Sequence, residues 1–200
     1  MTTPQDVFLV GLDVPGDRPV EQGDLSLALA GAELIDLLGV RALTLEGERI
    51  VPGPLPTTGN RLLDEAGAAL VRGEPYETVE DWLWRRGQGL AAAYRDVLES
   101  EGQLTGRPRR WPSLRRAGGA PADTPARRRA ADRWWAREPV LAGLAAALGI
   151  RDGRPAAQEP DDEAVVTVLV AVGDAVTELE AVRERRRIEN AAFDNIWRAP

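Results

Sequence analysis

The sequence of 200 residues contains no cysteine, no histidine and no lysine, so all 25 of its basic residues are arginines. Without cysteine and histidine, the common zinc-ligand sets, a Ser-His-Asp triad and a Cys-His nucleophile are unavailable. Without lysine, a Schiff base and the lysine of a Walker loop are unavailable as well. Carboxylates, hydroxyls and guanidinium groups remain, and we expect a protein that is not an enzyme and has no metal site and no cofactor.

The missing cysteines also predict that the protein has no disulfide bonds and is not exported. The N-terminal stretch lacks the basic start and long apolar run of a signal peptide. No apolar run approaches the roughly 20 residues that a membrane span requires. Because 44% of the residues are apolar, the chain can form a sizeable core, and we expect one cytoplasmic domain over residues 1–200.

The charge is distributed unevenly along the chain, whose net charge is −7. Residues 1–81 contain 15 acidic side chains and 5 arginines, whereas residues 82–137 contain 5 acidic side chains and 13 arginines. Residues 138–200 are acidic again, with 12 acidic side chains and 7 arginines. A basic central region of this kind meets an anionic surface or neutralises acidic segments of its own protein.

The basic charge is most concentrated in the stretch TGRPRRWPSLRR, residues 105–116, which has five arginines and one tryptophan in twelve residues. No helical stripe explains Trp111, which lies between Arg110 and a proline. Aromatic side chains with basic neighbours favour the membrane–water interface, and they also stack on nucleic-acid bases. A hairpin that folds back onto the domain and covers it with Trp111 is the simpler structural alternative.

The residue pattern predicts a mainly α-helical bundle with small β-hairpins. Side-chain caps at Asp24, Asn60 and Thr78 indicate three helix starts, and Pro125 suits the first turn of a fourth. The expected helices are 25–38, 61–72, 79–100, 125–137, 141–148 and 161–187, followed by a short helix with Phe193 and Trp197. A hairpin is expected around Leu43–Ile50, a short two-stranded or loop element over 104–114, a linker over 117–125 and a loop over 151–160.

Several local patterns favour structure over chemistry. Gly87-Gln-Gly-Leu-Ala-Ala92 matches a dinucleotide fingerprint in letters, but a helical stretch precedes it where a strand is required. Each tryptophan in the pairs Trp82/Trp84 and Trp134/Trp135 should face a different side, so one of each pair is expected in the core. Acidic pairs such as Glu80-Asp81 suit the first turns of helices.

Five stretches in order resemble the Golgi phosphoprotein 3 family, including its bacterial and especially actinobacterial members. They are VFLVGLD, LSLALAGAELIDLLGVRALTLEGERI, PTTGNRLLDEA, ETVEDWL and YRDVLESEGQL, which lie within residues 5–116. The remainder, 117–200, matches only as a series of helices. The resemblance implies a mostly helical single domain that attaches to membranes peripherally and recognises phosphatidylinositol 4-phosphate.

In the eukaryotic members, a tryptophan and three arginines bind the lipid headgroup, and a β-hairpin inserts its apolar tip into the bilayer. The hairpin corresponds to Thr105–Leu114, and the four headgroup-binding positions correspond to Glu21, Ala30, Gln88 and Ala91. We therefore expect peripheral attachment to anionic lipid on the inner face of the membrane. The candidate contact residues are Arg85, Arg86, Arg95, Arg107, Arg109, Arg110, Trp111, Arg115 and Arg116.

Three other functions remain open from the sequence, one of them an enzyme based on carboxylates, for which no convincing catalytic set is evident. A protein–protein adaptor of the same fold would use the basic region to bind an acidic partner. A winged-helix-like nucleic-acid-binding protein also combines helices with a basic hairpin, but the net charge of −7 and the absence of a basic recognition helix disfavour nucleic acid. The expected partners are thus an anionic lipid, a protein partner and a second copy of the chain in an oligomer.

Overall fold

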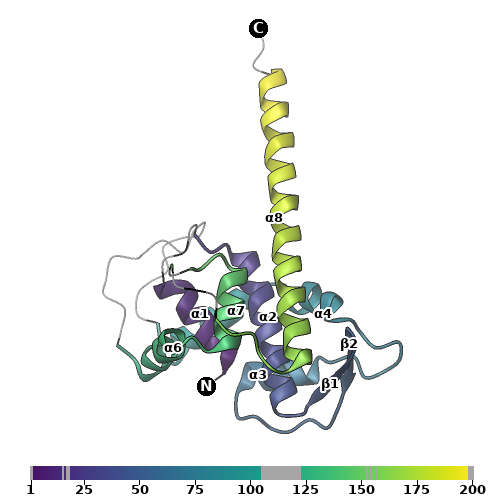
Figure 1. Ribbon diagram of the computed structural model, residues 1–200. Helices are drawn as coiled ribbons and strands as arrows, with labels where there is room; N and C mark the ends of the chain where they lie inside the picture. The colour runs from purple at the N-terminus through teal and green to yellow at the C-terminus, as the bar shows by residue number, and fades with distance from the viewer. Residues whose placement is uncertain are drawn as a thin grey trace.

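The computed structural model describes residues 2–14, 16, 19–104, 123–151, 153, 155 and 157–197, with side chains described as far as residue 190. These residues form a mainly helical domain with one two-stranded hairpin, which confirms the expected fold class (Figure 1). The elements are α1 Thr3–Asp13, α2 Gln22–Gly39, β1 Leu43–Glu46, β2 Arg49–Pro52, α3 Arg61–Ala68, α4 Val79–Arg86, α5 Leu90–Ser100, α6 Pro125–Trp135, α7 Pro139–Ala147 and α8 Glu163–Trp197.

Helix α1 lies in the interior, where α2, α5, α6 and α7 contact it. Residues 3–11 are all buried, including the carboxylate of Asp6. No helix was expected in this stretch. A helix that is covered on every side has no polar face, so its sequence lacks the amphipathic period by which surface helices are recognised.

Helices α2 and α8 cross in the centre of the domain at a point of close approach. A Cβ atom added to Gly31 would lie 2.3 Å from Cγ2 of Val172, so only glycine permits this distance between the helices. The stripe of α8 that faces the core is buried at Val165, Val168, Val172 and Val176. This stripe belongs to the long helix that was expected over residues 161–187.

The expected hairpin is confirmed. Strands β1 and β2 pair antiparallel, with Glu46 opposite Arg49, so Gly47 and Glu48 form the turn. Gly47 has a φ of +60°, which only glycine adopts without strain. The other edge of β2 is hydrogen-bonded to the segment that precedes α4. There, the Ile50 N–H of β2 donates to the Glu77 carbonyl.

Two of the three side-chain helix caps are confirmed. The Asn60 side chain accepts a hydrogen bond from Leu63 N–H, and the Thr78 side chain accepts one from Asp81 N–H. The prediction of Asp24 as a cap was wrong, because α2 begins at Gln22 and the Asp24 carboxylate binds Arg183 instead.

Three predicted helix ends differ from the structure. Helix α3 ends at Ala68 rather than residue 72. The single helix predicted over 79–100 is two helices, separated at residues 87–89, where Gly89 takes a φ of +72°. The C-terminal helix is continuous to Trp197, so the separate short helix predicted around Phe193 does not form. The break falls at Gly87 and Gly89, because glycine is unfavourable within a helix.

The tryptophan pairs divide as expected. Trp82 is fully buried and donates from Nε1 to the Ala30 carbonyl at 3.1 Å, whereas Trp84 is half-buried. Trp134 is buried and Trp135 is exposed. The element expected over 104–114 and most of the linker over 117–125 lie outside the described residues. None of the helices described here is both long and apolar enough to cross a membrane.

Candidate anion-binding site

The candidate site was predicted from two groups of arginines. Arg107, Arg109, Arg110, Trp111, Arg115 and Arg116 lie outside the described residues, between Leu104 at the end of the α5 region and Asp123 before α6. Arg85, Arg86 and Arg95 lie on α4 and α5 and are described. Their surroundings decide how readily each could bind an external anion.

Arg85 is held by the chain that leads into α4. Its Nε and Nη2 atoms donate to the two carboxylate oxygens of Glu77, each at 2.7 Å, and Nη2 also donates to the Ala69 carbonyl. The guanidinium group stacks over the Trp82 ring at 5.2 Å from its centroid. A bidentate pair of hydrogen bonds of this kind fixes both the position and the orientation of the guanidinium plane.

Arg86 points into the domain, toward α2. Its Nε and Nη2 atoms donate to the Glu33 carboxylate at 2.8 and 2.9 Å, and the Tyr94 hydroxyl donates to the same carboxylate at 3.0 Å. Glu33 is 0% exposed. Burial raises the pKa of Glu33, and the bonds from Arg86 and Tyr94 oppose that rise because they stabilise the carboxylate.

Arg95 lies one helix further along the chain. Its guanidinium group stands 5.9 Å from the centroid of the Phe8 ring, and its Nη1 atom is 3.9 Å from a carboxylate oxygen of Glu99. Arg85, Arg86 and Arg95 therefore contact three different carboxylates on different parts of the chain. An external phosphate would have to compete with each of them.

The arginines of α6 serve the interior, a role that the sequence analysis did not assign to particular residues. Arg129 and Arg133 both donate to the Asp6 carboxylate at 2.6 Å, and Asp6 is only 1% exposed. Arg127 donates to Asp13 at the end of α1, also at 2.6 Å. These bonds show that part of the basic region neutralises acidic groups of its own protein, which was one of the two interpretations of its charge.

A signal for these pairs exists in the sequence. Asp6 directly precedes the apolar stretch VFLV, and a carboxylate that is buried with such a stretch requires a cation. Arg129 and Arg133 are four residues apart and so lie on one face of a helix. What the sequence lacks is any indication that this face, more than 120 positions away, packs against α1.

The positions that correspond to the family's headgroup-binding residues lie where α2 meets the junction of α4 and α5. Ala30 and Ala91 are fully buried, and the Ala91 N–H donates to the Ser26 hydroxyl at 3.1 Å. Glu21 precedes α2 and Gln88 lies exposed in the junction. These positions supply no cationic side chain to hold a phosphate.

Comparison with known families identifies the chain. The family Golgi phosphoprotein 3 (GPP34) matches residues 4–198, which is nearly the whole sequence. The chain therefore belongs to the Golgi phosphoprotein 3 family, and the match includes the C-terminal part, which resembles the family only as a series of helices. This family is not one of enzymes. A comparison with curated proteins finds no significant match.

Proposed function

We propose that this protein is a non-enzymatic peripheral membrane protein that binds anionic lipid headgroups through Arg107, Arg109, Arg110, Trp111, Arg115 and Arg116. It would act in the cytoplasm, on the inner face of the membrane. The family to which the chain belongs supports this proposal, and so does the distribution of its positive charge.

The observation that carries the proposal is how the described arginines of the basic region are used. Seven of them have carboxylate partners within 4 Å, namely Arg85, Arg86, Arg95, Arg127, Arg128, Arg129 and Arg133. Arg137 donates to the Pro155 carbonyl. Carboxylates of the domain therefore bind seven of the eight described arginines of residues 82–137, and we propose that the arginines of residues 105–116 are the ones that meet an external partner.

The strength of such a contact follows from the number of cations. Each arginine at an anionic membrane surface contributes about 1 kcal/mol, so five contribute about 5 kcal/mol. This corresponds to a dissociation constant of roughly 0.2 mM, to which a partly inserted Trp111 would add. We expect weak, salt-sensitive binding, because screening shortens the range of the attraction from about 10 Å at 0.1 M salt to about 3 Å at 1 M.

The lipid specificity of the eukaryotic members need not carry over. A 4-phosphate headgroup is bound by cationic donors, and the positions Glu21, Ala30, Gln88 and Ala91 offer none. Arg85 is the most exposed of the three described candidate arginines, and a phosphate would have to displace Glu77 from it. We therefore propose that charge density, more than a fitted headgroup pocket, selects the membrane.

Liposome flotation tests the proposal. The wild type would be mixed with vesicles of phosphatidylcholine alone, or with vesicles that also contain phosphatidylglycerol, cardiolipin, phosphatidylinositol or its 4-phosphate, at low and high salt. We expect flotation with every anionic composition at low salt, little with the neutral one, and loss of flotation in the Arg109→Ala/Arg110→Ala/Trp111→Ala variant.

The matched control is Arg61→Ala/Arg72→Ala/Trp135→Ala, which also removes two arginines and one tryptophan, all exposed. It should float like the wild type. Equal flotation of the two triple variants would place the membrane contact elsewhere. If the wild type floats with no composition, the lipid function is refuted and a protein-binding adaptor of the same fold becomes the better proposal.

A further inference from the structure

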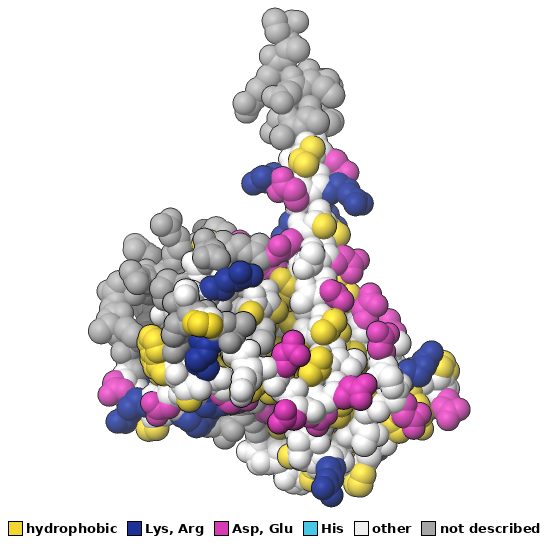
Figure 2. Space-filling model, in the orientation of Figure 1, with side chains coloured by type: hydrophobic (Ala, Val, Ile, Leu, Met, Phe, Trp, Pro, Cys, Tyr) yellow, Lys and Arg dark blue, Asp and Glu magenta, His cyan; other side chains and the backbone are white. Residues whose placement is uncertain are grey.

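Three large apolar side chains are exposed around the end of α2. Val40 follows α2, Leu55 lies in the loop between β2 and α3, and Val71 follows α3. Their side chains are 43%, 46% and 40% exposed. The helix α3 and the hairpin lie at the lower end of the domain in Figure 1, where Figure 2 shows apolar side chains beside a basic one. Single exposed apolar residues are common, but a contiguous group of them marks a contact surface.

Hydrogen bonds and close packing bring these three segments together. The Gly53 N–H donates to the Ala42 carbonyl at 2.8 Å, and the Gly53 carbonyl accepts a bond from Nη1 of Arg72 at 3.2 Å. Leu55 packs against α3, because a Cβ atom added to Gly67 would lie 2.9 Å from Cδ2 of Leu55. The segments form one surface, which we call the Leu55 surface and whose exposed members are Val40, Arg41, Leu55, Val71 and Arg72.

The loop that carries Leu55 is fixed at both ends. The hydrogen bonds described above hold its beginning. At its other end, the Thr58 N–H and hydroxyl donate to one carboxylate oxygen of Asp64 at 2.7 and 2.6 Å. Leu55 lies between Pro54 and Pro56, and each proline ring fixes its own φ. A side chain that is held in place before binding loses little conformational freedom on binding, which favours a role as an anchor.

Arg41 occupies a backbone position at which glycine is the usual residue. It follows the end of α2 with a φ of +57°, and its N–H closes the helix by donating to the Leu38 carbonyl at 2.9 Å. Within the described residues, the other non-glycine residue with a positive φ is Arg137, whose side chain donates to the Pro155 carbonyl. The side chain of Arg41 has no such described bond, so the fold itself gives no reason for an arginine at this position.

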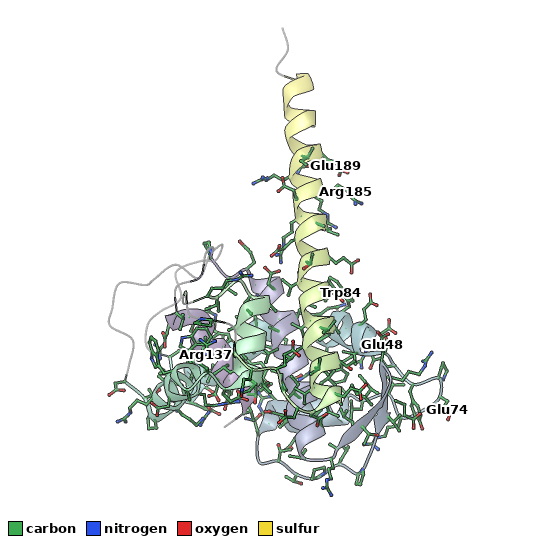
Figure 3. All side chains as sticks on the ribbon, in the orientation of Figure 1. Glu48, Glu74, Trp84, Arg137, Arg185 and Glu189 are labelled. Atoms are coloured by element: carbon green, nitrogen blue, oxygen red, sulfur yellow. The ribbon has the colours of Figure 1, made fainter. Side chains whose placement is uncertain are left out.

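The two arginines of the Leu55 surface are available to a partner. Among the residues that the structure describes, neither Arg41 nor Arg72 forms an ion pair, in contrast to the seven paired arginines of residues 82–137. The carboxylate nearest to Arg72 in the sequence is Glu74, which Figure 3 shows at the outer edge of the domain. The Leu55 surface thus combines apolar side chains with two positive charges that no described carboxylate neutralises.

We propose that the Leu55 surface binds a segment of a partner protein that carries apolar side chains beside carboxylates. The three apolar residues would pack against the apolar side chains of that segment, and Arg41 and Arg72 would donate to its carboxylates. Complementary charge selects such a partner over a basic one and sets its register on the surface. A membrane is a poorer occupant, because two cations attract anionic lipid far less than the five of residues 105–116 do. The inference goes beyond the proposed lipid function and does not depend on it.

Peptide selection tests which chemistry the Leu55 surface accepts. Random twelve-residue peptides displayed on phage would be selected on the immobilised wild type, after removal of those that also bind the Leu55→Ser protein. We expect the remaining peptides to contain carboxylates beside leucine or aromatic residues, with few basic residues. If no peptide distinguishes the two proteins, or if the peptides that do so lack carboxylates, the proposal is overturned.

Fluorescence anisotropy of a labelled selected peptide measures the contribution of residues that the selection did not use. Arg41→Ala/Arg72→Ala should weaken binding of the peptide about tenfold, and Val71→Ser about fivefold, as loss of an interface anchor does. Added salt should weaken binding to the wild type, because it screens the arginines. Unchanged affinity in both variants would contradict the proposal.

Matched controls remove the same kinds of side chain elsewhere. Val170→Ser replaces another exposed valine, and Arg185→Ala/Arg186→Ala removes two other exposed arginines. Both proteins should bind the selected peptide like the wild type. Equal weakening in the controls would show general attraction by charge and apolar area, which would also contradict the proposal.

Arg41→Gly separates binding from folding. Because glycine suits a positive φ, this variant should melt at the same temperature as the wild type or a higher one, yet bind the selected peptide more weakly. A lower melting temperature would show that the arginine serves the fold, and unchanged affinity would show that it does not contact the partner. Either result would overturn the proposal.

Discussion

The buried pair of Arg86 and Glu33 permits a sharp prediction about stability. The Glu33 carboxylate is wholly buried and depends on three hydrogen bonds, two from Arg86 and one from Tyr94. Arg86→Met removes the one cation bonded to it among the described residues while keeping most of the side-chain volume. Because a buried carboxylate is then left with one neutral donor, we expect the free energy of unfolding to fall by about 3–5 kcal/mol near neutral pH.

This loss is large for a domain whose total stability is of the order of 5–15 kcal/mol. For a chain of this size it corresponds to a decrease in melting temperature of roughly 6–20 °C. Urea unfolding followed by circular dichroism measures it directly. Two variants serve as controls. Arg61→Met breaks an exposed ion pair with Glu65 and should lower the free energy of unfolding by at most about 0.5 kcal/mol. Glu33→Gln/Arg86→Met should regain most of the free energy that Arg86→Met loses, since both charges are gone.

The pH dependence gives an independent check. Burial already raises the pKa of Glu33 in the folded protein, and loss of Arg86 should raise it further. A group whose folded pKa lies above its unfolded pKa is stabilising while protonated, and that stabilisation is lost as the pH rises through the folded pKa. The cost of Arg86→Met should therefore be smaller at about pH 5 than at about pH 8. A cost below about 1 kcal/mol that does not change with pH would refute the reasoning.

Three further predictions concern other contacts. Asp6→Asn should lower the free energy of unfolding by about 1–3 kcal/mol, because Arg129 and Arg133 lose their charged acceptor but remain partly hydrated; urea unfolding at high and low salt would show it. Gly31→Ala should cost about 1–3 kcal/mol, because its Cβ would lie 2.3 Å from Val172, and Val172→Ala in the same chain should restore part of the loss. Asn60→Ala should cost about 0.5–2 kcal/mol through loss of the α3 cap, whereas Asn60→Asp should keep it, as thermal melts would report.

Much of the fold could be predicted because its signals act over a few residues. The caps at Asn60 and Thr78 bond to N–H groups three positions away, and the turn at Gly47 needs only one residue with a positive φ. The division of Trp82 from Trp84 follows from the helical period alone. Helix α1 was missed because a helix buried on all sides carries no such period.

The candidate site, too, could be predicted from the sequence only in part. The concentration of arginine in residues 82–137 is plain in the sequence, and so is the absence of cationic side chains at the family's headgroup-binding positions. The sequence does not reveal which arginines are already bound. Asp6 binds Arg129 and Arg133 because α6 packs against α1 in the folded protein. Glu33 binds Arg86 because α4 packs against α2.

The sequence by itself thus determined the helical class, most helix starts, the hairpin, the membership of the family and the location of the excess positive charge, because each rests on residue type and short-range spacing. The tertiary structure decided which charges neutralise one another, where α4 separates from α5, and that Val40, Leu55 and Val71 meet on one surface. These depend on contacts between residues up to 159 positions apart, such as Arg183 with Asp24. No local pattern encodes such contacts, because the burial that makes them favourable exists only once the helices have packed together.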